Sequence, residues 1–110
     1  MDKKLMNKYT IVENGLQEAV TNAGTSHLFL ENIMKQGNEE KTRMAVIYHS
    51  RVHQRYGKIS VLYDMFFDDM TTLSETTLEE VYNVKWLERF SKIIEEQQKN
   101  LEELIKLTKK

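Results

Sequence analysis

The sequence contains no cysteine and no proline, and only four of its 110 residues are glycine. Without cysteine, the chain cannot form disulfides, bind a metal through thiolates or use a cysteine nucleophile. The absence of proline removes the strongest helix breaker from a composition that is rich in helix-forming residues such as Glu, Lys, Leu and Gln. We therefore expect an all-α protein in a reducing compartment, the cytoplasm.

Long apolar runs are also missing. No stretch approaches the roughly 20 apolar residues that a membrane span requires, and the basic first residues are not followed by the apolar segment of a signal peptide. The net charge is only −1, and the apolar residues recur too regularly for a disordered chain. The length suits one domain, residues 1–110, and a chain of this size can bury a hydrophobic core without the help of disulfides or a structural metal.

The N-terminal third predicts two helices. Apolar residues spaced by three and four favour a first helix over residues 3–21, and residues 22–25 then form a turn. Ser26 caps a short second helix over residues 27–35, which ends before Gly37. This second helix is apolar almost all round, so we place it in the core.

The middle of the chain predicts one helix from residue 39 to residue 70, about 45 Å long at 1.5 Å per residue. Its apolar series holds its phase across Gly57, and an interior glycine costs only about 1 kcal/mol. In the alternative interpretation, a first helix ends at Tyr56 with Gly57 in the left-handed conformation, and a second begins at Lys58.

The C-terminal part predicts a loop and a long helix. Residues 71–77 are rich in hydroxyl groups, so we expect a loop with Thr76 or Thr77 as the helix cap. The helix over residues 77–106 then carries a heptad pattern that packs antiparallel to the other long helix. Its buried columns are Leu87, Ile94 and Leu101, and Phe90, Gln97 and Leu104. The expected fold is a compact helical bundle with two long antiparallel helices and one or two shorter ones.

The charges of residues 41–80 are sorted into two blocks. Sorting of this kind affects electrostatic complementarity and encounter rate rather than fold, so it points to a charged surface that the protein meets. We predict a regulator or stoichiometric inhibitor that acts by protein–protein interaction, and a basic partner surface would suit its acidic block. Residues expected to bind the partner are Asp64, Asp68, Asp69 and Glu75 from the acidic block and Arg51, Arg55 and Lys58 from the basic block.

The same order of charges suggests a homodimer. Two copies of the long helix that cross antiparallel near Gly57 would set basic residues against acidic ones twice, as an isologous interface requires. Tyr56, Tyr63 and Phe67 would supply its apolar centre. In the rival explanation, the C-terminal helix of the same chain supplies the opposite charges.

A nucleic-acid-binding regulator is the alternative function. Arg51, Arg55 and Lys58 form a stripe that could lie along phosphates. The chain is not basic overall, however, and the neighbouring acidic block would repel a nucleic-acid backbone. We therefore rank this function below protein binding.

The three histidines are candidate metal ligands, whereas the acidic block lacks the Asp and Gly spacing of a calcium loop. His49 and His53 stand four residues apart and share one face of a helix, but two ligands do not complete a site. Ser50 follows His49, so the zinc-protease pattern is absent. His27 would complete a site only if its helix packs beside the long one. We predict no bound metal, no cofactor and no enzymatic activity, since no nucleophile, phosphate loop or complete ligand set is present.

Overall fold

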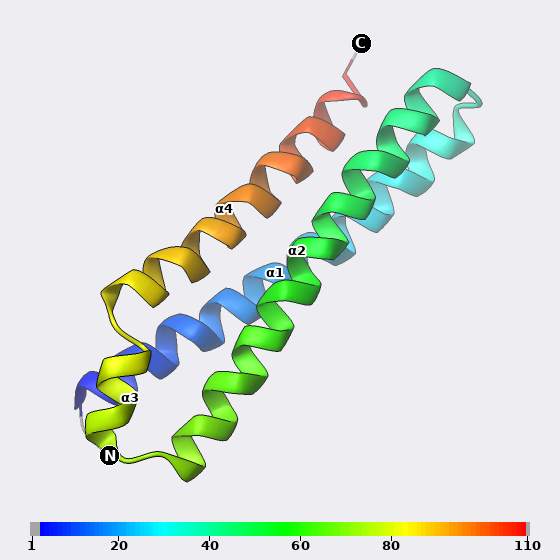
Figure 1. Ribbon diagram of the computed structural model, residues 1–110. Coiled ribbons are helices and arrows are strands. Elements are labelled where there is room, and N and C mark those ends of the chain that lie inside the picture. The colour runs from blue at the N-terminus through cyan, green and yellow to red at the C-terminus, as the bar shows by residue number, and fades with distance from the viewer. Residues whose placement is uncertain (1–2, 110) are drawn as a thin grey trace.

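The computed structural model describes residues 3–109, which form an elongated bundle of 55 × 19 × 17 Å. Three long helices lie side by side, with the first and last running in the same direction and the second running against both (Figure 1). The helices are α1 (Lys3–Lys35), α2 (Glu39–Thr72), the short α3 (Glu75–Val81) and α4 (Val84–Lys106). The predicted all-α helical bundle is confirmed.

Helix α1 is continuous, so the predicted turn at residues 22–25 is wrong. Gly24 is exposed and costs the helix about 1 kcal/mol, which the burial of apolar side chains on both sides of it outweighs. Ser26 does not cap a helix. It is fully buried inside α1, and its hydroxyl donates to the Ala23 carbonyl over 2.8 Å. The predicted core helix is also wrong, because Leu28 and Met34 are 61% and 54% exposed.

The connection between α1 and α2 follows simple capping rules. Gly37 adopts a φ of 74°, a left-handed conformation that glycine reaches without steric cost. Asn38 then caps α2, and its side chain accepts from the Lys41 amide over 3.0 Å. This tight turn sets α2 antiparallel to α1.

Helix α2 runs through Gly57 without a break, as the periodicity predicted. It also continues to Thr72, so most of the predicted loop at residues 71–77 is helical. The Thr71 and Thr72 hydroxyls donate back to the Asp68 carbonyl, which allows them to stay in the helix. Ser74, and not Thr76 or Thr77, caps the next helix by accepting from the Thr77 amide.

The single helix predicted for residues 77–106 is instead divided into α3 and α4. Asn83 makes the break because its side chain accepts from the Trp86 amide and caps α4. The turn places Tyr82 in the core, where its ring packs edge-on against Phe66 and Trp86 at centroid distances of 4.8 and 4.7 Å. Burial of this aromatic ring compensates for the interrupted helix.

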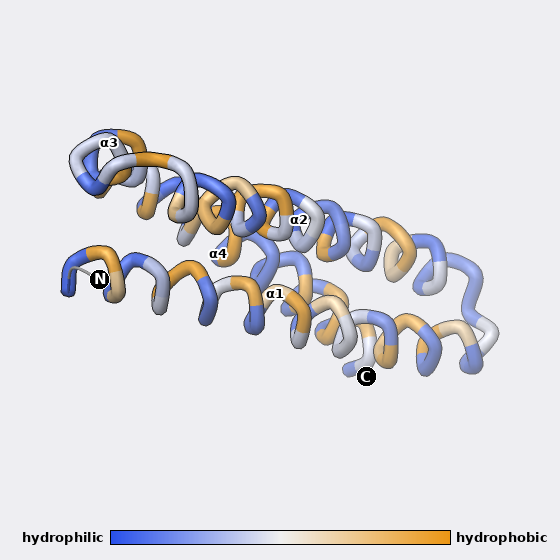
Figure 2. The backbone as a smooth tube through the Cα atoms, turned by 90° about the horizontal axis from the view of Figure 1, so that it is seen from below, coloured by the Kyte–Doolittle hydropathy of each residue, from blue (hydrophilic) through white to orange (hydrophobic). Residues whose placement is uncertain are grey.

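Two hydrophobic clusters fill the bundle, and hydrophobic positions recur along each helix (Figure 2). The cluster at the α3 end comprises Val12, Ala19, Ile59, Phe66, Leu78, Tyr82, Phe90 and Ile94. The cluster at the opposite end comprises Ala23, Ile33, Ala45, Val52, Leu101 and Leu104. The heptad residues Ile94, Leu101 and Leu104 are buried as predicted, whereas Leu87 is half-buried.

Gln97 forms a polar layer between the two clusters and is fully buried. Its amide nitrogen donates to the Ala19 carbonyl of α1 over 3.0 Å and to the Val52 carbonyl of α2 over 3.3 Å. Its amide oxygen accepts from the Asn22 side chain over 3.1 Å. One side chain of α4 therefore ties all three long helices together.

Replacing Gln97 by Glu should destabilise the protein far more than replacing it by Met. A glutamate cannot donate to the two carbonyls and would bury a charge, a loss of about 3 kcal/mol. Methionine loses the hydrogen bonds but buries no unpaired charge, so we expect a loss of about 1 kcal/mol. Urea unfolding at pH 7 measures both values, and equal losses for the two variants would contradict a donor role for Gln97.

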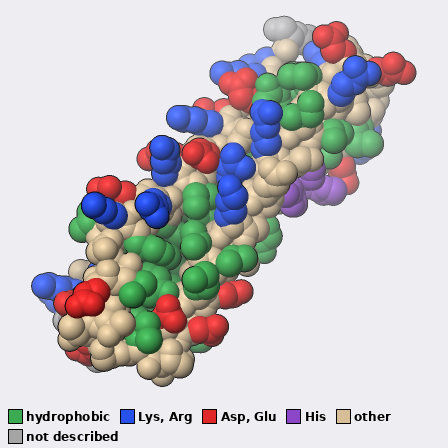
Figure 3. Space-filling view, in the orientation of Figure 1, with side chains coloured by type: hydrophobic (Ala, Val, Ile, Leu, Met, Phe, Trp, Pro, Cys, Tyr) green, Lys and Arg blue, Asp and Glu red, His purple; other side chains and the backbone are tan. Residues whose placement is uncertain are grey.

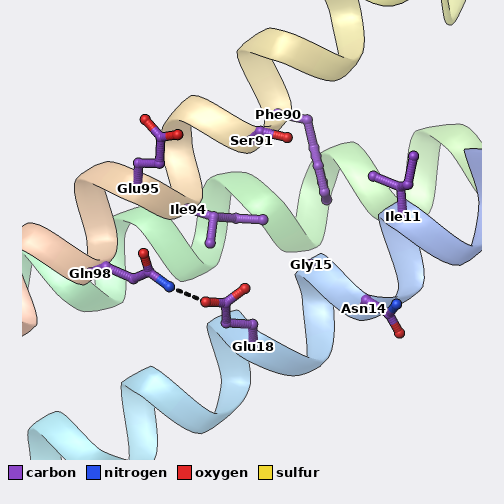
Figure 4. A pocket seen from close by; sticks show the side chains of 9 residues that line it. All are labelled: Ile11, Asn14, Gly15, Glu18, Phe90, Ser91, Ile94, Glu95 and Gln98. Atoms are coloured by element: carbon purple, nitrogen blue, oxygen red, sulfur yellow. Dashed lines mark hydrogen bonds between the residues drawn. The ribbon is translucent and has the colours of Figure 1, made fainter.

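Gly15 permits the close approach of α1 and α4. In Figure 4, the ring of Phe90 points toward the turn of α1 that contains Gly15. A β-carbon at this position would lie 2.4 Å from Phe90 Cε1 and 2.7 Å from Ile94 Cδ1. Phe90 is fully buried and stacks on Trp86, with ring centroids 5.4 Å apart, so it has little room to move.

Alanine substitutions at Gly15 and Gly57 should have opposite effects on stability. Gly15→Ala overpacks the core at a cost of about 1–3 kcal/mol, which exceeds its gain in helix propensity. Gly57 has open space around the position of a β-carbon, so Gly57→Ala should stabilise α2 by about 1 kcal/mol. Circular dichroism during urea unfolding measures both. Destabilisation by Gly57→Ala would show that its backbone has a further role within the chain.

Candidate interaction surface on α2 and α4

The predicted basic residues Arg51, Arg55 and Lys58 lie on the side of α2 that faces α4. Arg55 Nε donates to Glu96 Oε2 of α4 over 3.2 Å, and Arg51 lies over the Tyr48 ring at 5.9 Å. Lys and Arg side chains form a row along this face over α2 and α4 (Figure 3). The rival explanation, in which α4 supplies the opposite charge, therefore holds for Arg55, while Arg51 and Lys58 remain exposed.

The predicted acidic residues lie toward the α3 end and do not act as one group. Asp64 and Asp68 are exposed on α2, and Glu75 is exposed in the first turn of α3. Asp69 is half-buried and accepts a hydrogen bond from the Tyr82 hydroxyl. Burial and this bond raise the pKa of Tyr82 above its usual value. Asp69 therefore has a partner within the chain.

The basic and acidic blocks also point in different directions. At 100° per residue, the column of Arg51 and Lys58 and the column of Asp64 and Asp68 lie about 110° apart around α2. An antiparallel pair of identical helices sets each side of a helix against the same side of its copy. Direct pairing of the two blocks across such a dimer would therefore require long side chains to reach over the helix.

The aromatic residues proposed for a dimer centre are largely used inside the bundle. Tyr56 and Tyr63 are half-buried and pack against the core clusters. A hydrogen bond to the Glu13 side chain of α1 raises the pKa of Tyr63 to about 12. Phe67 stacks on Tyr63 with centroids 6.3 Å apart and is 47% exposed. Of the three rings, Phe67 offers the most surface to a partner.

An apolar groove of about 450 Å³ lies between α2 and α4 beside Gly57. Its lining consists of Gly57, Lys58, Val61 and Leu62 from α2 and Ile93 from α4, and it offers only apolar atoms. Val61 is 59% exposed, and Met65, one turn further along α2, is 53% exposed. Sequence reasoning identified Gly57 and Lys58 but missed the other lining residues. The four-residue spacing of Gly57, Val61 and Met65 was the available signal.

One side of this groove carries positive charges. Lys58 lines it, Arg51 is exposed on the same side of α2, and Arg89 is exposed on α4 one turn before Ile93. The Glu96 carboxylate on the same side of α4 is already paired with Arg55. The exposed acids Asp64 and Asp68 stand three residues after Val61 and Met65 and border the other side. The basic side of the groove therefore suits an apolar ligand with a negative flank.

The three histidines come together on another side of the molecule, between α1 and α2. The ring centroids of His49 and His53 are 4.2 Å apart, and those of His27 and His49 are 5.8 Å apart. Burial lowers the pKa of His49 from its usual value, and the charges of protonated His53 and His27 lower it further. A hydrogen bond at Ser26 acts in the opposite direction.

The lowered pKa of His49 predicts a loss of stability in mild acid. An unfolded histidine takes up its proton near pH 6.5, whereas folded His49 resists protonation until a lower pH. The unfolded state therefore binds more protons in this window, and the free energy of unfolding falls as the pH drops below about 6.5. Urea unfolding of wild type and His49→Gln between pH 7.5 and about 5.5 measures the effect. We expect a shallower slope for the variant, and parallel slopes would contradict this assignment.

Comparison with protein-family models, with curated proteins and with solved structures found no match. Within residues 3–109, none of the helices is both long and apolar enough to cross a membrane.

Proposed function

We propose that this protein acts without catalysis, as a regulator or stoichiometric inhibitor, by binding another protein in the groove between α2 and α4. The occupant is an amphipathic helix whose apolar stripe enters the groove and whose flanks are acidic. The observation that carries this proposal is the apolar groove at Gly57, which Lys58 lines and near which Arg51 and Arg89 are exposed on the same two helices. Its lining belongs to the two helices that also carry the basic side chains.

The apolar part of the surface supplies the affinity. Val61 and Met65 are more than half exposed, and full burial of such a side chain contributes about 1.5–3 kcal/mol. Gly57 leaves open space above the backbone of α2, so a partner helix can approach more closely there than over any larger residue. Glycine at this position weakens α2 by about 1 kcal/mol, and no side chain among residues 3–109 comes within 4 Å of the place where its β-carbon would lie.

The positive charges on one side of the groove supply the selectivity. Arg51 and Lys58 on α2 and Arg89 on α4 are exposed, and they flank an apolar wall. Acidic flanks on the partner would be attracted to these groups during encounter, whereas basic flanks would be repelled. Binding should therefore be faster and tighter at low salt.

A second copy of the chain and nucleic acid are the two alternative ligands of the groove, and the experiment below distinguishes them. A second copy of the chain could place its own exposed Asp64 and Asp68 near the positive charges, which keeps the homodimer as a prediction. Nucleic acid could use the row of basic side chains. It matches the surface less well, because Arg55 is engaged by Glu96 and the space between the basic residues is apolar. The acidic residues near α3 offer a separate contact for a basic partner.

Fluorescence anisotropy with two labelled helical peptides tests the proposal. Both peptides carry the same leucine stripe, and their flanks contain either glutamate or lysine. We expect the acidic peptide to bind, the basic peptide to fail, and the affinity to fall with added salt. Val61→Asp should weaken binding at least about tenfold, since it places a charge in the apolar wall.

Val20→Asp is the matched control, because Val20 is 48% exposed on α1 and does not line the groove. Equal binding of both peptides, or equal loss in both aspartate variants, would refute the acidic helix as occupant. Sedimentation equilibrium of the free protein tests the second copy. A dimer that dissociates in Val61→Asp would assign the groove to self-association, and strong competition by duplex DNA would favour nucleic acid.

A further inference from the structure

The three histidines of the chain meet at one place although they come from two helices. His27 belongs to α1, and His49 and His53 stand one turn apart on α2. They form a group at the edge of the molecule in Figure 3. The sequence predicted a complete site only if the helix of His27 packs beside α2, and in the structure the His27 ring lies beside that of His49.

Ser26 determines which nitrogen of His49 is free. The Ser26 hydroxyl has one proton and donates it to the Ala23 carbonyl over 2.8 Å. With the hydroxyl proton on the Ala23 carbonyl, the contact of 3.0 Å between Ser26 Oγ and His49 Nδ1 has the imidazole N–H as donor. Neutral His49 then carries its lone pair on Nε2, the nitrogen that is free to bind a metal ion.

Glu31 has a similar effect on His27. Its carboxylate Oε1 lies 3.1 Å from His27 Nε2, so neutral His27 donates from Nε2 and keeps a lone pair on Nδ1. A carboxylate that accepts from a ligand histidine orients the ring and makes it a better donor to a metal. Two of the three rings therefore already have hydrogen-bond partners of the kind found around metal sites.

The spacing of the rings suits a shared metal ion. Two imidazoles bound to one tetrahedral metal at about 2.1 Å have ring centroids roughly 5 Å apart. The observed values of 4.2 and 5.8 Å lie on either side of that distance. As the side chains stand within residues 3–109, no group of three or more His, Cys, Asp or Glu residues is placed to hold a metal ion, so the rings must move to share one. His53 is exposed and can change rotamer at little cost, whereas His27 must keep its contact with Glu31 or exchange it for the metal.

We propose that His27, His49 and His53 form a binding site for a divalent transition metal, of which zinc and copper are the best matches. Neutral imidazole is a preferred ligand of both ions. Three nitrogens leave a fourth position open for water or for a ligand from a partner. The site lies between α1 and α2, and His53 stands one turn before Gly57 of the groove. The metal titration uses no peptide and the peptide assay uses no metal, so the two proposals are tested independently.

Isothermal titration of the untagged protein with zinc, and separately with copper(II), tests the site. We expect one ion per chain, with copper binding more tightly than zinc as the Irving–Williams order requires. Each of His27→Ala, His49→Ala and His53→Ala should weaken binding at least about tenfold, since each removes one of three ligands. The imidazole NMR signals of all three residues should shift in wild type at the same metal concentration.

The double variant Asp64→Asn with Asp68→Asn is the control. It removes two exposed carboxylates of α2, which could bind a divalent ion through oxygen in place of the imidazole nitrogens. Its affinity should equal that of wild type. Circular dichroism checks that each variant is folded, and the NMR shifts of wild type do not depend on any variant. Unchanged affinity in His27→Ala would reduce the site to the pair on α2 and overturn the proposal. Failure to bind either metal would also overturn it.

Discussion

The side-chain amide of Gln97 sets the relative position of all three long helices. It is buried where the two hydrophobic clusters meet, and its three hydrogen bonds reach Ala19, Asn22 and Val52. Apolar packing alone tolerates small shifts of one helix along another, because leucine and isoleucine have no directional requirement. A shift by one turn would leave this amide buried without partners, which costs more than the apolar contacts would recover. The alignment of the charged surfaces and of the histidines follows from this register.

Gly15 and Gly57 have different roles in the structure. Gly15 lies under Phe90 and Ile94, so its missing side chain allows α1 and α4 to come together. Gly57 lies in open space on α2 and brings no benefit to packing within the chain. A residue that weakens a helix without helping its core is consistent with use of that surface by another molecule, and the groove between α2 and α4 begins at this residue.

The bundle separates three kinds of surface around α2. The side toward α4 carries basic residues and the apolar groove, and the exposed acids Asp64 and Asp68 lie about 110° around the helix. The histidines occupy the border with α1. His53 and Asp64 point in similar directions but stand 11 residues apart along α2, so a partner at one surface need not cover the others. A small helical protein can in this way present several independent contacts on a rigid frame.

The sequence by itself determined the helical class, the continuity of α2 across Gly57 and the buried positions Ile94, Leu101 and Leu104. These features depend on the spacing of neighbouring residues, which a helix converts directly into a face. Only the tertiary structure decided that α1 continues through residues 22–25, because its stability there comes from burial against α2 and α4. Tertiary packing likewise buried Tyr82 at the break between α3 and α4, although Asn83 already carried a capping signal.

The candidate sites were also predicted only in part from the sequence. Spacing along α2 predicted that Arg51, Arg55 and Lys58 share a stripe and that His49 and His53 share a face. The pairing of Arg55 with Glu96, the contribution of Ile93 to the groove and the approach of His27 to His49 join residues that are 22 or more positions apart. Local periodicity carries no information about such distances. They are decided by which helix faces meet, and here by the register that Gln97 imposes.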